Sequence, residues 1–365
     1  MRKVFFSSGP SKKFKEWHQD LFLDDLKERS HTDLNIKNRI KNILIKIKEV
    51  LCLPSDYKVI FTSGSGSGAM ASAFLNLLNK NFPCDILISD YFSKEWAKDL
   101  KDMNLDLNCY DIWNNYEFAE PNLREDSDKI LVQVETTLGI KIPNFNFLNN
   151  NKGITIVDAI SAAFLEEMPW KIFDATAVSL QKVLGVDTAM GILILSPKAV
   201  ERIDDEKQWP IPRCLNVKRW GLCELENGRV MSSPSMYSLI ELEAVLDWVI
   251  KNGGVSFLRK KSIENHDVLN DELKMWGNVK KIIPEKSQAL ASVCLEPKFF
   301  DKKNLNAEER KKFIKKISDL ACENGIYDII NFARPCFRIW LGPMQEAEDV
   351  AYGVHKICKL IAQNS

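Results

Sequence analysis

A lysine stands at the end of an apolar run, where a solvated charge is not expected. The run AVSLQKVLG, at residues 177–185, presents Gln181 and Lys182 and then turns at Gly185. A lysine amine in partly buried surroundings is a nucleophile and a proton carrier once it has lost its own proton. The same side chain could instead extend its amine to water along its apolar stem. The lysine alone therefore leaves both interpretations open.

A carboxylate ends another apolar run. Asp158 follows GITIV in the stretch at 153–159. An acid buried at a strand tip is costly unless a cation or a hydrogen-bond donor faces it. Taken alone, an aspartate at this place is more often the N-cap of a following helix.

A glycine–serine turn offers free backbone donors. The stretch TSGSGSGAM, at 62–70, runs from an apolar segment into a helical one and contains Ser65, Gly66 and Ser67. The N–H groups and the dipole at such a helix start can hold a phosphate. The stretch lacks the GK[ST] ending of a nucleotide loop, and a flexible turn that needs positive φ explains it equally well.

The elements that must position these groups alternate between strand-like and helix-like patterns. Five aliphatic residues from Ile36 to Val50 recur at steps of four and three, which predicts an amphipathic helix over 34–51. Apolar strands interleaved with helices predict an α/β fold with a mainly parallel sheet, which binds ligands at the carboxyl ends of its strands. The predicted strands are 58–63, 85–90, 129–134, 153–159, 175–180 and 191–196, and the helices between them include 69–80 and 93–103.

The last third of the chain has a different pattern. A strong helix is predicted over 235–252, and a pair of glycines stops it. Strand signals then become sparse, with one run at 289–296 and another at 336–342. This pattern indicates a smaller α+β domain after the large one.

The three polar groups, taken together and in this order on a parallel sheet, fit pyridoxal phosphate. The lysine amine would attach to the cofactor covalently, the carboxylate would keep its ring nitrogen protonated, and the glycine–serine turn would hold its phosphate. An aromatic ring should stack on the cofactor. Trp96, in the helix after 85–90, is the candidate, although a tryptophan on an amphipathic helix is more often part of the core.

Eight stretches, in order along the chain, carry a resemblance to a known family. They are FFSSGPS near the start, RSH at 29–31, ETTLGIKIPN at 135–144, VDAISAAF at 157–164, SLQKVLG, GILILSPKAVERI at 191–203, SSPSM at 232–236 and FRIWLG at 337–342. Over nearly its whole length the chain resembles the class V aminotransferases of fold type I, and within them the phosphoserine aminotransferase branch of alpha-proteobacteria. The resemblance implies an α/β fold whose large domain has a mainly parallel central sheet, followed by a small C-terminal α+β domain. The implied domains are a large cofactor-binding domain, 15–250, and a small substrate-closing domain, 251–365 with the N-terminal segment 1–14.

The resemblance also implies roles for particular residues. Lys182 is the lysine that bonds to pyridoxal 5′-phosphate, with Asp158 as the second catalytic group. The implied cofactor ligands are Ser65, Gly66, Ser67 and Gln181 at the phosphate, Thr136 and Asp158 at the ring, and Trp96 stacked on it. Ser232 and Ser233 stand where the family usually has Asn-Thr, supplied by the partner subunit of a homodimer with shared active sites. Arg338 matches the arginine that binds the substrate α-carboxylate, with Ser8 and Gly9 lining the same end.

The substrate end departs from the family pattern. After the histidine of RSH the family has an arginine that contacts the substrate phosphate, but here His31 is followed by Thr32. Losing one charge-assisted hydrogen bond to a phosphate costs roughly 1.5 to 3 kcal/mol. Arg334 could occupy the place of a second phosphate-binding arginine. Three further arginines could compensate or could be solvated surface charges: Arg213, Arg219 and Arg229.

The resemblance leaves three functions to consider: an aminotransferase for either of two kinds of substrate, or a protein without catalytic activity. The family transfers the amino group of glutamate to 3-phosphohydroxypyruvate, giving O-phosphoserine and 2-oxoglutarate in serine biosynthesis. The departure at Thr32 keeps open a sibling aminotransferase for a small amino or keto acid with a sulfonate, phosphonate or neutral side chain. A catalytically silent scaffold is the third alternative, which would not need Lys182, Asp158 and the glycine–serine turn together.

Composition limits the partners and the compartment. The 365 residues include 50 basic and 50 acidic ones, so no net charge attracts nucleic acid or an anionic membrane. The 9 cysteines are scattered, with no CxxC pair and no metal-ligand spacing. No apolar span is long enough for a membrane helix, and the start of the chain lacks a signal-peptide pattern. We therefore expect a soluble cytoplasmic protein that binds small amino and keto acids and no metal, nucleic acid or membrane.

Overall fold

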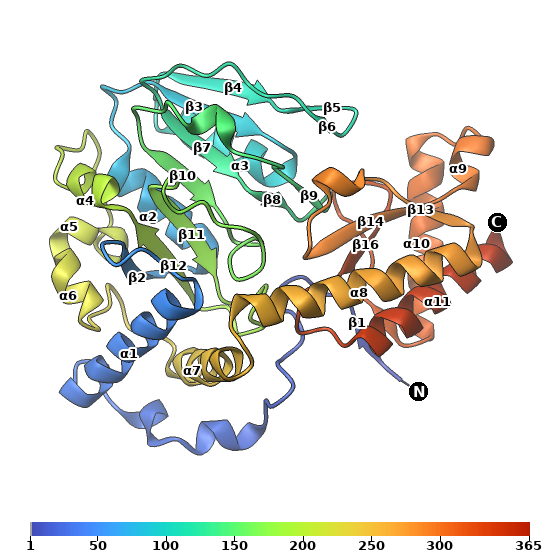
Figure 1. The fold of residues 1–365 in the computed structure, drawn as a ribbon, viewed down its shortest axis with the longest axis horizontal. Coiled ribbons are helices and arrows are strands. Elements are labelled where there is room, and N and C mark those ends of the chain that lie inside the picture. Colours follow the sequence, from blue (N-terminus) through green and yellow to red (C-terminus); the bar gives the residue numbers. More distant parts are fainter. Residues whose placement is uncertain (1) are drawn as a thin grey trace.

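A seven-stranded sheet forms the centre of the larger part of the molecule in the computed structural model, which describes residues 2–365 (Figure 1). The strand order is β2-β12-β11-β10-β7-β3-β4. Neighbouring strands are parallel except at β12, which is antiparallel to both β11 and β2. The expected α/β fold with a mainly parallel sheet is confirmed. The strands are β2 (Lys58–Ser63), β3 (Cys84–Ile88), β4 (Leu107–Asp111), β7 (Asp128–Val132), β10 (Thr155–Asp158), β11 (Ala175–Ser179) and β12 (Met190–Leu195).

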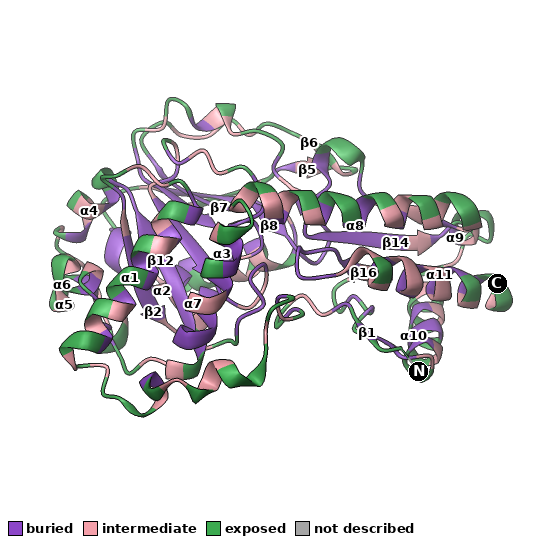
Figure 2. Cartoon of the chain, turned by 60° about the horizontal axis from the view of Figure 1, so that its bottom comes forward, coloured by how far each residue is buried: buried purple, intermediate pink, exposed green. Residues whose placement is uncertain are grey.

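Helices cover both faces of this sheet because its strands are apolar on both sides. In β2, Val59 and Phe61 belong to the core cluster that includes helices α1 (Leu34–Val50) and α7 (Met236–Lys251). Ile60 belongs to the cluster that includes helices α2 (Ser65–Leu77) and α3 (Tyr91–Asp102). This alternation follows from the two-residue period of a strand. Figure 2 shows the result, with buried strands between helices whose outer faces are exposed.

Three of the four predicted helices begin and end within two residues of their predicted positions, whereas the helix predicted over 69–80 is α2, which begins four residues earlier. The predicted helix 34–51 is α1, which Asp33 caps by accepting a hydrogen bond from the backbone N–H of Asn35. The predicted helix 235–252 is α7, which begins after the cap Ser235. These helices are α1 (Leu34–Val50), α2 (Ser65–Leu77), α3 (Tyr91–Asp102), α4 (Pro197–Ile203), α5 (Val217–Trp220), α6 (Leu222–Glu226) and α7 (Met236–Lys251), and short 3-10 turns lie at η1 (Gln19–Leu23), η2 (Asp25–Glu28), η3 (Asn146–Leu148) and η4 (Arg213–Leu215).

The C-terminal part contains a second, antiparallel sheet in the order β13-β14-β16. Helix α8 leads into it from α7 and lies alongside α11 (Figure 1). The N-terminal strand β1 pairs with β15, so the start of the chain joins this part, although the domain boundaries remain a prediction. The elements are β1 (Val4–Phe5), β13 (Val279–Lys281), β14 (Ser292–Pro297), β15 (Ile326–Tyr327), β16 (Phe337–Trp340), α8 (Val255–Trp276), η5 (Glu285–Ser287), α9 (Phe299–Lys302), α10 (Ala307–Glu323) and α11 (Ala347–Asn364).

Two small hairpins extend from the carboxyl side of the large sheet. They are β5 (Trp113–Asn114) with β6 (Glu117–Phe118), and β8 (Val134–Glu135) with β9 (Ile140–Lys141). The second hairpin contacts the smaller sheet, because the thiol of Cys294 in β14 donates to the carbonyl of Thr137, between β8 and β9, at 3.3 Å. The two sheets therefore meet near the carboxyl ends of the central strands.

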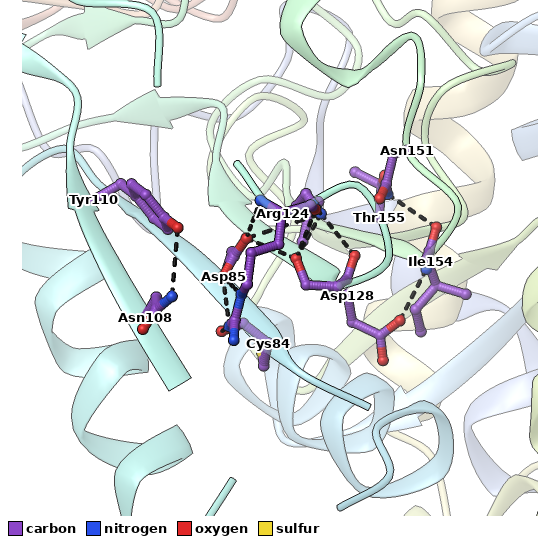
Figure 3. A network of polar contacts seen from close by, with 12 residues as sticks. Cys84, Asp85, Asn108, Tyr110, Arg124, Asp128, Asn151, Ile154 and Thr155 are labelled. Atoms are coloured by element: carbon purple, nitrogen blue, oxygen red, sulfur yellow. Dashed lines mark hydrogen bonds and ion pairs between the residues drawn. The ribbon is translucent and has the colours of Figure 1, made fainter. Parts of the chain in front are cut away.

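A polar network fixes the opposite, amino ends of the central strands (Figure 3). Arg124 donates from Nε to the buried carboxylate of Asp85 at 2.8 Å and from a second nitrogen to the carbonyl of Cys84 at 2.8 Å. Asp128 accepts a hydrogen bond from the N–H of Ile154 at 2.9 Å. These charges are satisfied by one another and by backbone groups, so we assign this end of the sheet to stability.

Candidate active site

A cavity of about 280 Å³ lies at the carboxyl ends of the central strands, where it also meets the C-terminal part. Most of the predicted site residues line it, although they come from distant parts of the sequence. Those on its lining are Ser8, Gly9, Ser65, Gly66, Ser67, Trp96, Thr136, Asp158, Gln181, Lys182 and Arg338. The parallel strands bring them together because their carboxyl ends share one edge.

Lys182 follows β11 and points its amine at two hydroxyl groups. Its Nζ lies 3.2 Å from Oγ1 of Thr136 and 3.1 Å from Oγ of Ser161. Burial lowers the pKa of Lys182 to about 8, and the nearby cation of Arg338 acts in the same direction, while Asp158 opposes it. The amine can therefore lose its proton near neutral pH, as a nucleophile or a general base must.

Asp158 ends β10 and is held by two donors. The indole N–H of Trp96 donates to its Oδ2 at 2.8 Å, and the backbone N–H of Ile160 donates to its Oδ1 at 3.0 Å. Burial raises the pKa of this carboxyl, against the opposing effect of both hydrogen bonds. A cation placed beside the carboxylate would stabilise its charged form, which is the role expected opposite a protonated ring nitrogen.

The glycine–serine turn leads from β2 into α2. Gly64 and Ser65 have φ values of 81° and 63°, a conformation that costs energy for a serine. Gln181 donates to the hydroxyl of Ser65 at 3.2 Å, which joins the turn to the lysine segment. A Cβ on Gly66 would lie 2.4 Å from the side-chain end of Ile160, so a larger residue there would require that side chain to shift. This helix start can hold an anion at its N–H groups.

The substrate end of the cavity carries one arginine. Arg338 comes from β16, and its Nε is buried with no hydrogen-bond partner. Within residues 2–365 it forms no ion pair, and it is the only arginine on the lining. Burial lowers the pKa of its guanidinium, so an anionic ligand would relieve an uncompensated charge there.

Four predicted residues do not line this cavity. Arg334 donates instead to Asp90 at 2.7 Å, in an ion pair that ties the loop before β16 to the start of α3. His31, Ser232 and Ser233 line a separate cavity on the same chain. Within one chain, therefore, the structure does not bring these four to Lys182.

Sequence reasoning missed two residues beside the lysine. The Phe92 ring lies 5.2 Å from Nζ of Lys182, so Phe92 is the aromatic group next to the amine. Trp96 also lines the cavity, but its contact with the site is the hydrogen bond to Asp158. Ser161 is the second missed residue. Their only sequence signals are their places just after a strand, Phe92 after β3 and Ser161 after β10.

The residues present fit pyridoxal phosphate. Besides Arg338, Gln181 has a buried polar atom without a partner, its Oε1, at the cavity. The cavity also combines an amine of lowered pKa, a buried carboxylate and a helix start. Among residues 2–365 no group of His, Cys, Asp and Glu is arranged to hold a metal ion, and no helix there could cross a membrane. The fold and the site together define a pyridoxal phosphate-dependent transferase of fold type I.

Comparisons with known proteins agree with this class. The family described as Aminotransferase class-V matches residues 6–326. The chain is 31% identical to the phosphoserine aminotransferase of Methanosarcina mazei, over 94% of this chain and 93% of that relative. It is 30% identical to that of Methanosarcina barkeri, with the same two coverages of 94% and 93%. The chain belongs to the class-V aminotransferase family and is an enzyme that uses pyridoxal 5′-phosphate.

Solved structures show the same fold. The pyridoxal phosphate-bound phosphoserine aminotransferase from Trichomonas vaginalis has a TM-score of 0.82 at 16% identity, covering 98% of this chain and 99% of that one. The phosphoserine aminotransferase from Bacillus circulans subsp. alkalophilus has a TM-score of 0.81 at 16% identity, covering 100% and 99%. The expectations of fold, cofactor and transamination are confirmed, and they favour an active aminotransferase over the silent scaffold.

Proposed function

We propose that this aminotransferase interconverts O-phosphoserine and 2-oxoglutarate with 3-phosphohydroxypyruvate and glutamate, a step of serine biosynthesis. The relatives at 31% and 30% identity, both named phosphoserine aminotransferase, support this substrate. The observation that carries the chemistry is the cavity itself, which combines Lys182, Asp158 and Arg338. An amino acid bound there would meet an arginine at one end and a proton-accepting amine at the other.

The chain's own groups account for binding and proton transfer. When bound, pyridoxal phosphate supplies an electron sink for the bond that breaks at the substrate α-carbon. Arg338 binds the α-carboxylate in a planar, two-point contact and so orients the α-hydrogen. The amine of Lys182 takes this proton and later returns it, because its lowered pKa allows both directions near neutral pH. Thr136 and Ser161 hold the amine in place.

The proposed assembly is a homodimer with shared active sites. Ser232 and Ser233 would bind the cofactor phosphate of the partner subunit, since they lie outside the Lys182 cavity of their own chain. Residues 251–365, with 1–14, would form the small domain that closes on the substrate. We also propose a cytoplasmic location, in which the free cysteines of the described chain stay reduced.

One observation favours the alternative of a sibling aminotransferase. Arg334 is bound to Asp90, and Thr32 replaces the arginine expected there. The Lys182 cavity of a single chain therefore has no second arginine for a substrate phosphate. An amino acid with a sulfonate, phosphonate or neutral side chain is the alternative substrate.

The two alternatives differ in a half-reaction with a single amino acid. The holoenzyme is mixed with O-phosphoserine, serine, alanine, cysteate or glutamate, and the loss of its yellow absorbance is followed. Loss with O-phosphoserine and glutamate, but not with serine or alanine, supports the proposed function. Loss with cysteate or alanine and not with O-phosphoserine supports the sibling enzyme. The Lys182→Ala variant is the control, since it should show no turnover with any amino acid.

A further inference from the structure

A second cavity, of about 710 Å³, lies beside α1 and η4 and shares no lining residue with the Lys182 cavity. We refer to it as the cationic cavity, because its lining includes Lys37, Arg213, Arg229 and His31 and no aspartate or glutamate. Three of these side chains carry a permanent charge at neutral pH. The cavity therefore presents a concentrated positive field to solvent.

The three permanent cations have no carboxylate partner among residues 2–365. Three other cations on the same helix α1 do have partners, since Arg39 and Lys46 bind Glu243 and Lys48 binds Glu226, whereas Lys41 is exposed to solvent. Lys37 is on this helix too, but it faces the cationic cavity and forms no ion pair in the described chain. Three unpaired cations therefore lie around one cavity, an arrangement that favours binding of an anion.

Trp220 fixes the two arginines of the cationic cavity. The guanidinium carbons lie over its ring at 4.9 Å for Arg213 and 4.7 Å for Arg229. The indole N–H donates to the carbonyl of Arg213 at 2.8 Å, which orients the ring. Two like charges on one ring repel each other unless an anion lies between them. Stacked guanidiniums keep their donors free for the planar contacts that phosphate accepts.

The backbone around the cationic cavity is held by close contacts. Gly228 has a φ of 88°, and a Cβ there would lie 1.9 Å from the carbonyl oxygen of Lys37. Only glycine therefore lets the Arg229 segment approach α1. On another wall, the hydroxyl of Ser232 lies 2.7 Å from that of Ser63, which ends β2 just before the phosphate turn. The cationic cavity is thus a built site with hydroxyl as well as cationic donors.

We infer that the cationic cavity binds a phosphate group through Lys37, Arg213 and Arg229. Phosphate has the tetrahedral charge that two guanidiniums and an amine satisfy together. The phosphate could be carried by an amino acid substrate in the partner's active site or be free phosphate. The first source rests on the proposed function and on the proposed dimer, since the same wall carries Ser232 and Ser233. In that case the cations of the cavity would supply the positive charge that the family's arginine provides and that Thr32 lacks.

The first test measures binding of inorganic phosphate to the holoenzyme, whose cofactor already fills the turn at Ser65. Equilibrium dialysis with radiolabelled phosphate should show that the Arg213→Gln/Arg229→Gln variant binds at least about tenfold more weakly than wild type. Arg219→Gln is the matched control, because Arg219 is a neighbouring exposed arginine outside the cavity lining. The Arg213→Lys/Arg229→Lys variant should keep much of the affinity, since it keeps both charges.

Two results of the dialysis would overturn the inference. One is a wild-type holoenzyme that binds no phosphate, and the other is a double glutamine variant that binds it as tightly as wild type and the Arg219→Gln control do. Circular dichroism of the double variant shows whether lost binding comes from lost folding. If the double glutamine variant is misfolded, the lysine pair decides: binding within a few fold of wild type supports the inference, and loss of binding contradicts it.

A second measurement identifies the source of the phosphate. In the half-reaction, the double glutamine variant should raise the apparent dissociation constant of O-phosphoserine about tenfold or more and leave that of glutamate nearly unchanged. Weaker phosphate binding with an unchanged dissociation constant for O-phosphoserine would assign the cationic cavity to free phosphate. A wild-type enzyme that binds phosphate there but does not use O-phosphoserine would refute the proposed function and leave the site in place.

Discussion

Two charged groups near Lys182 shift the pKa of its amine in opposite directions. Burial lowers this pKa to about 8, Arg338 lowers it further, and Asp158 raises it. An unperturbed lysine has a pKa of about 10.4. The neutral amine is the reactive form. Lys182 should therefore become reactive at a pH about two units lower than an exposed lysine does.

This setting can be measured without the cofactor. In cofactor-free enzyme, trinitrobenzenesulfonate should modify Lys182 with a rate midpoint near pH 8, followed by peptide mass spectrometry. Arg338→Gln should raise the midpoint, because it removes a cation, and Asp158→Asn should lower it, because it removes an anion. A midpoint near that of the exposed lysines, or shifts of the opposite sign, would contradict the assigned surroundings.

Trp96 is expected to act through Asp158 as a positioning residue. Trp96→Phe keeps a ring but removes the N–H that donates to the Asp158 carboxylate. We expect the affinity for pyridoxal phosphate to fall about tenfold, the effect of losing a hydrogen bond to a charged group. Equilibrium dialysis measures it, and in an Asp158→Asn background the same substitution should have a much smaller effect. An unchanged affinity would mean that Trp96 contributes only its ring.

Sequence patterns located the charged groups of the cavity better than its neutral ones. Lys182 and Asp158 stand out because a charge at the end of an apolar run must have a reason. Phe92 and Ser161 carry no such signal, since a phenylalanine and a serine next to a strand are ordinary. The ion pair of Arg334 with Asp90 could not be predicted either, because it joins the loop before β16 to the start of α3, which are far apart in the sequence.

At the scale of elements, Glu135 links the small hairpin β8–β9 to the helix that carries Phe92 and Trp96. Its buried carboxylate accepts hydrogen bonds from the backbone N–H groups of Ser93 at 2.8 Å and Phe92 at 3.3 Å. Burial nevertheless raises the pKa of Glu135 to about 7 from its usual 4.5. The start of α3 is thus fixed by a carboxyl whose charged form is costly.

This cost predicts a pH dependence of stability. Because the folded pKa is above the unfolded one, the contribution of Glu135 is fully present below pH 4.5 and is lost as pH rises through about 7. The loss amounts to about 3 kcal/mol. The free energy of unfolding can be measured with urea for the wild type and for Glu135→Gln. From roughly pH 5 to roughly pH 7.5, the value of the wild type should fall relative to that of the variant. A constant difference across this range would contradict the raised pKa.

Sequence patterns predict the buried helices and strands more accurately than the exposed ones. Strands such as β2, β11 and β12 were predicted within a residue because they are continuous apolar runs. Strand β4 was missed because its sequence LNCYD is partly exposed and has no strong alternation. The antiparallel direction of β12 was also not predicted, since a strand buried on both faces reads the same in either direction.

At the scale of the whole molecule, one chain does not complete the set of predicted ligands. His31, Ser232 and Ser233 lie around the cationic cavity, apart from Lys182. Contacts between two copies leave no periodic signal in a sequence, so the shared site came only from the resemblance to the family. In a twofold dimer the two active sites are equivalent. If one chain contributes Ser232 and Ser233 to the site of its partner, the partner contributes the same two residues to the site of the first chain.

Heterodimers of two defective chains provide the test of sharing. One chain carries Lys182→Ala, and the other carries Ser232→Asp and Ser233→Asp, whose negative charges should repel the cofactor phosphate. Each homodimer should be inactive or nearly so. A heterodimer purified by two different tags has one site with both defects and one with neither, so it should regain about half of the wild-type activity. Heterodimers as inactive as their parents, or a holoenzyme that sediments as a monomer, would show that each chain works with its own residues alone.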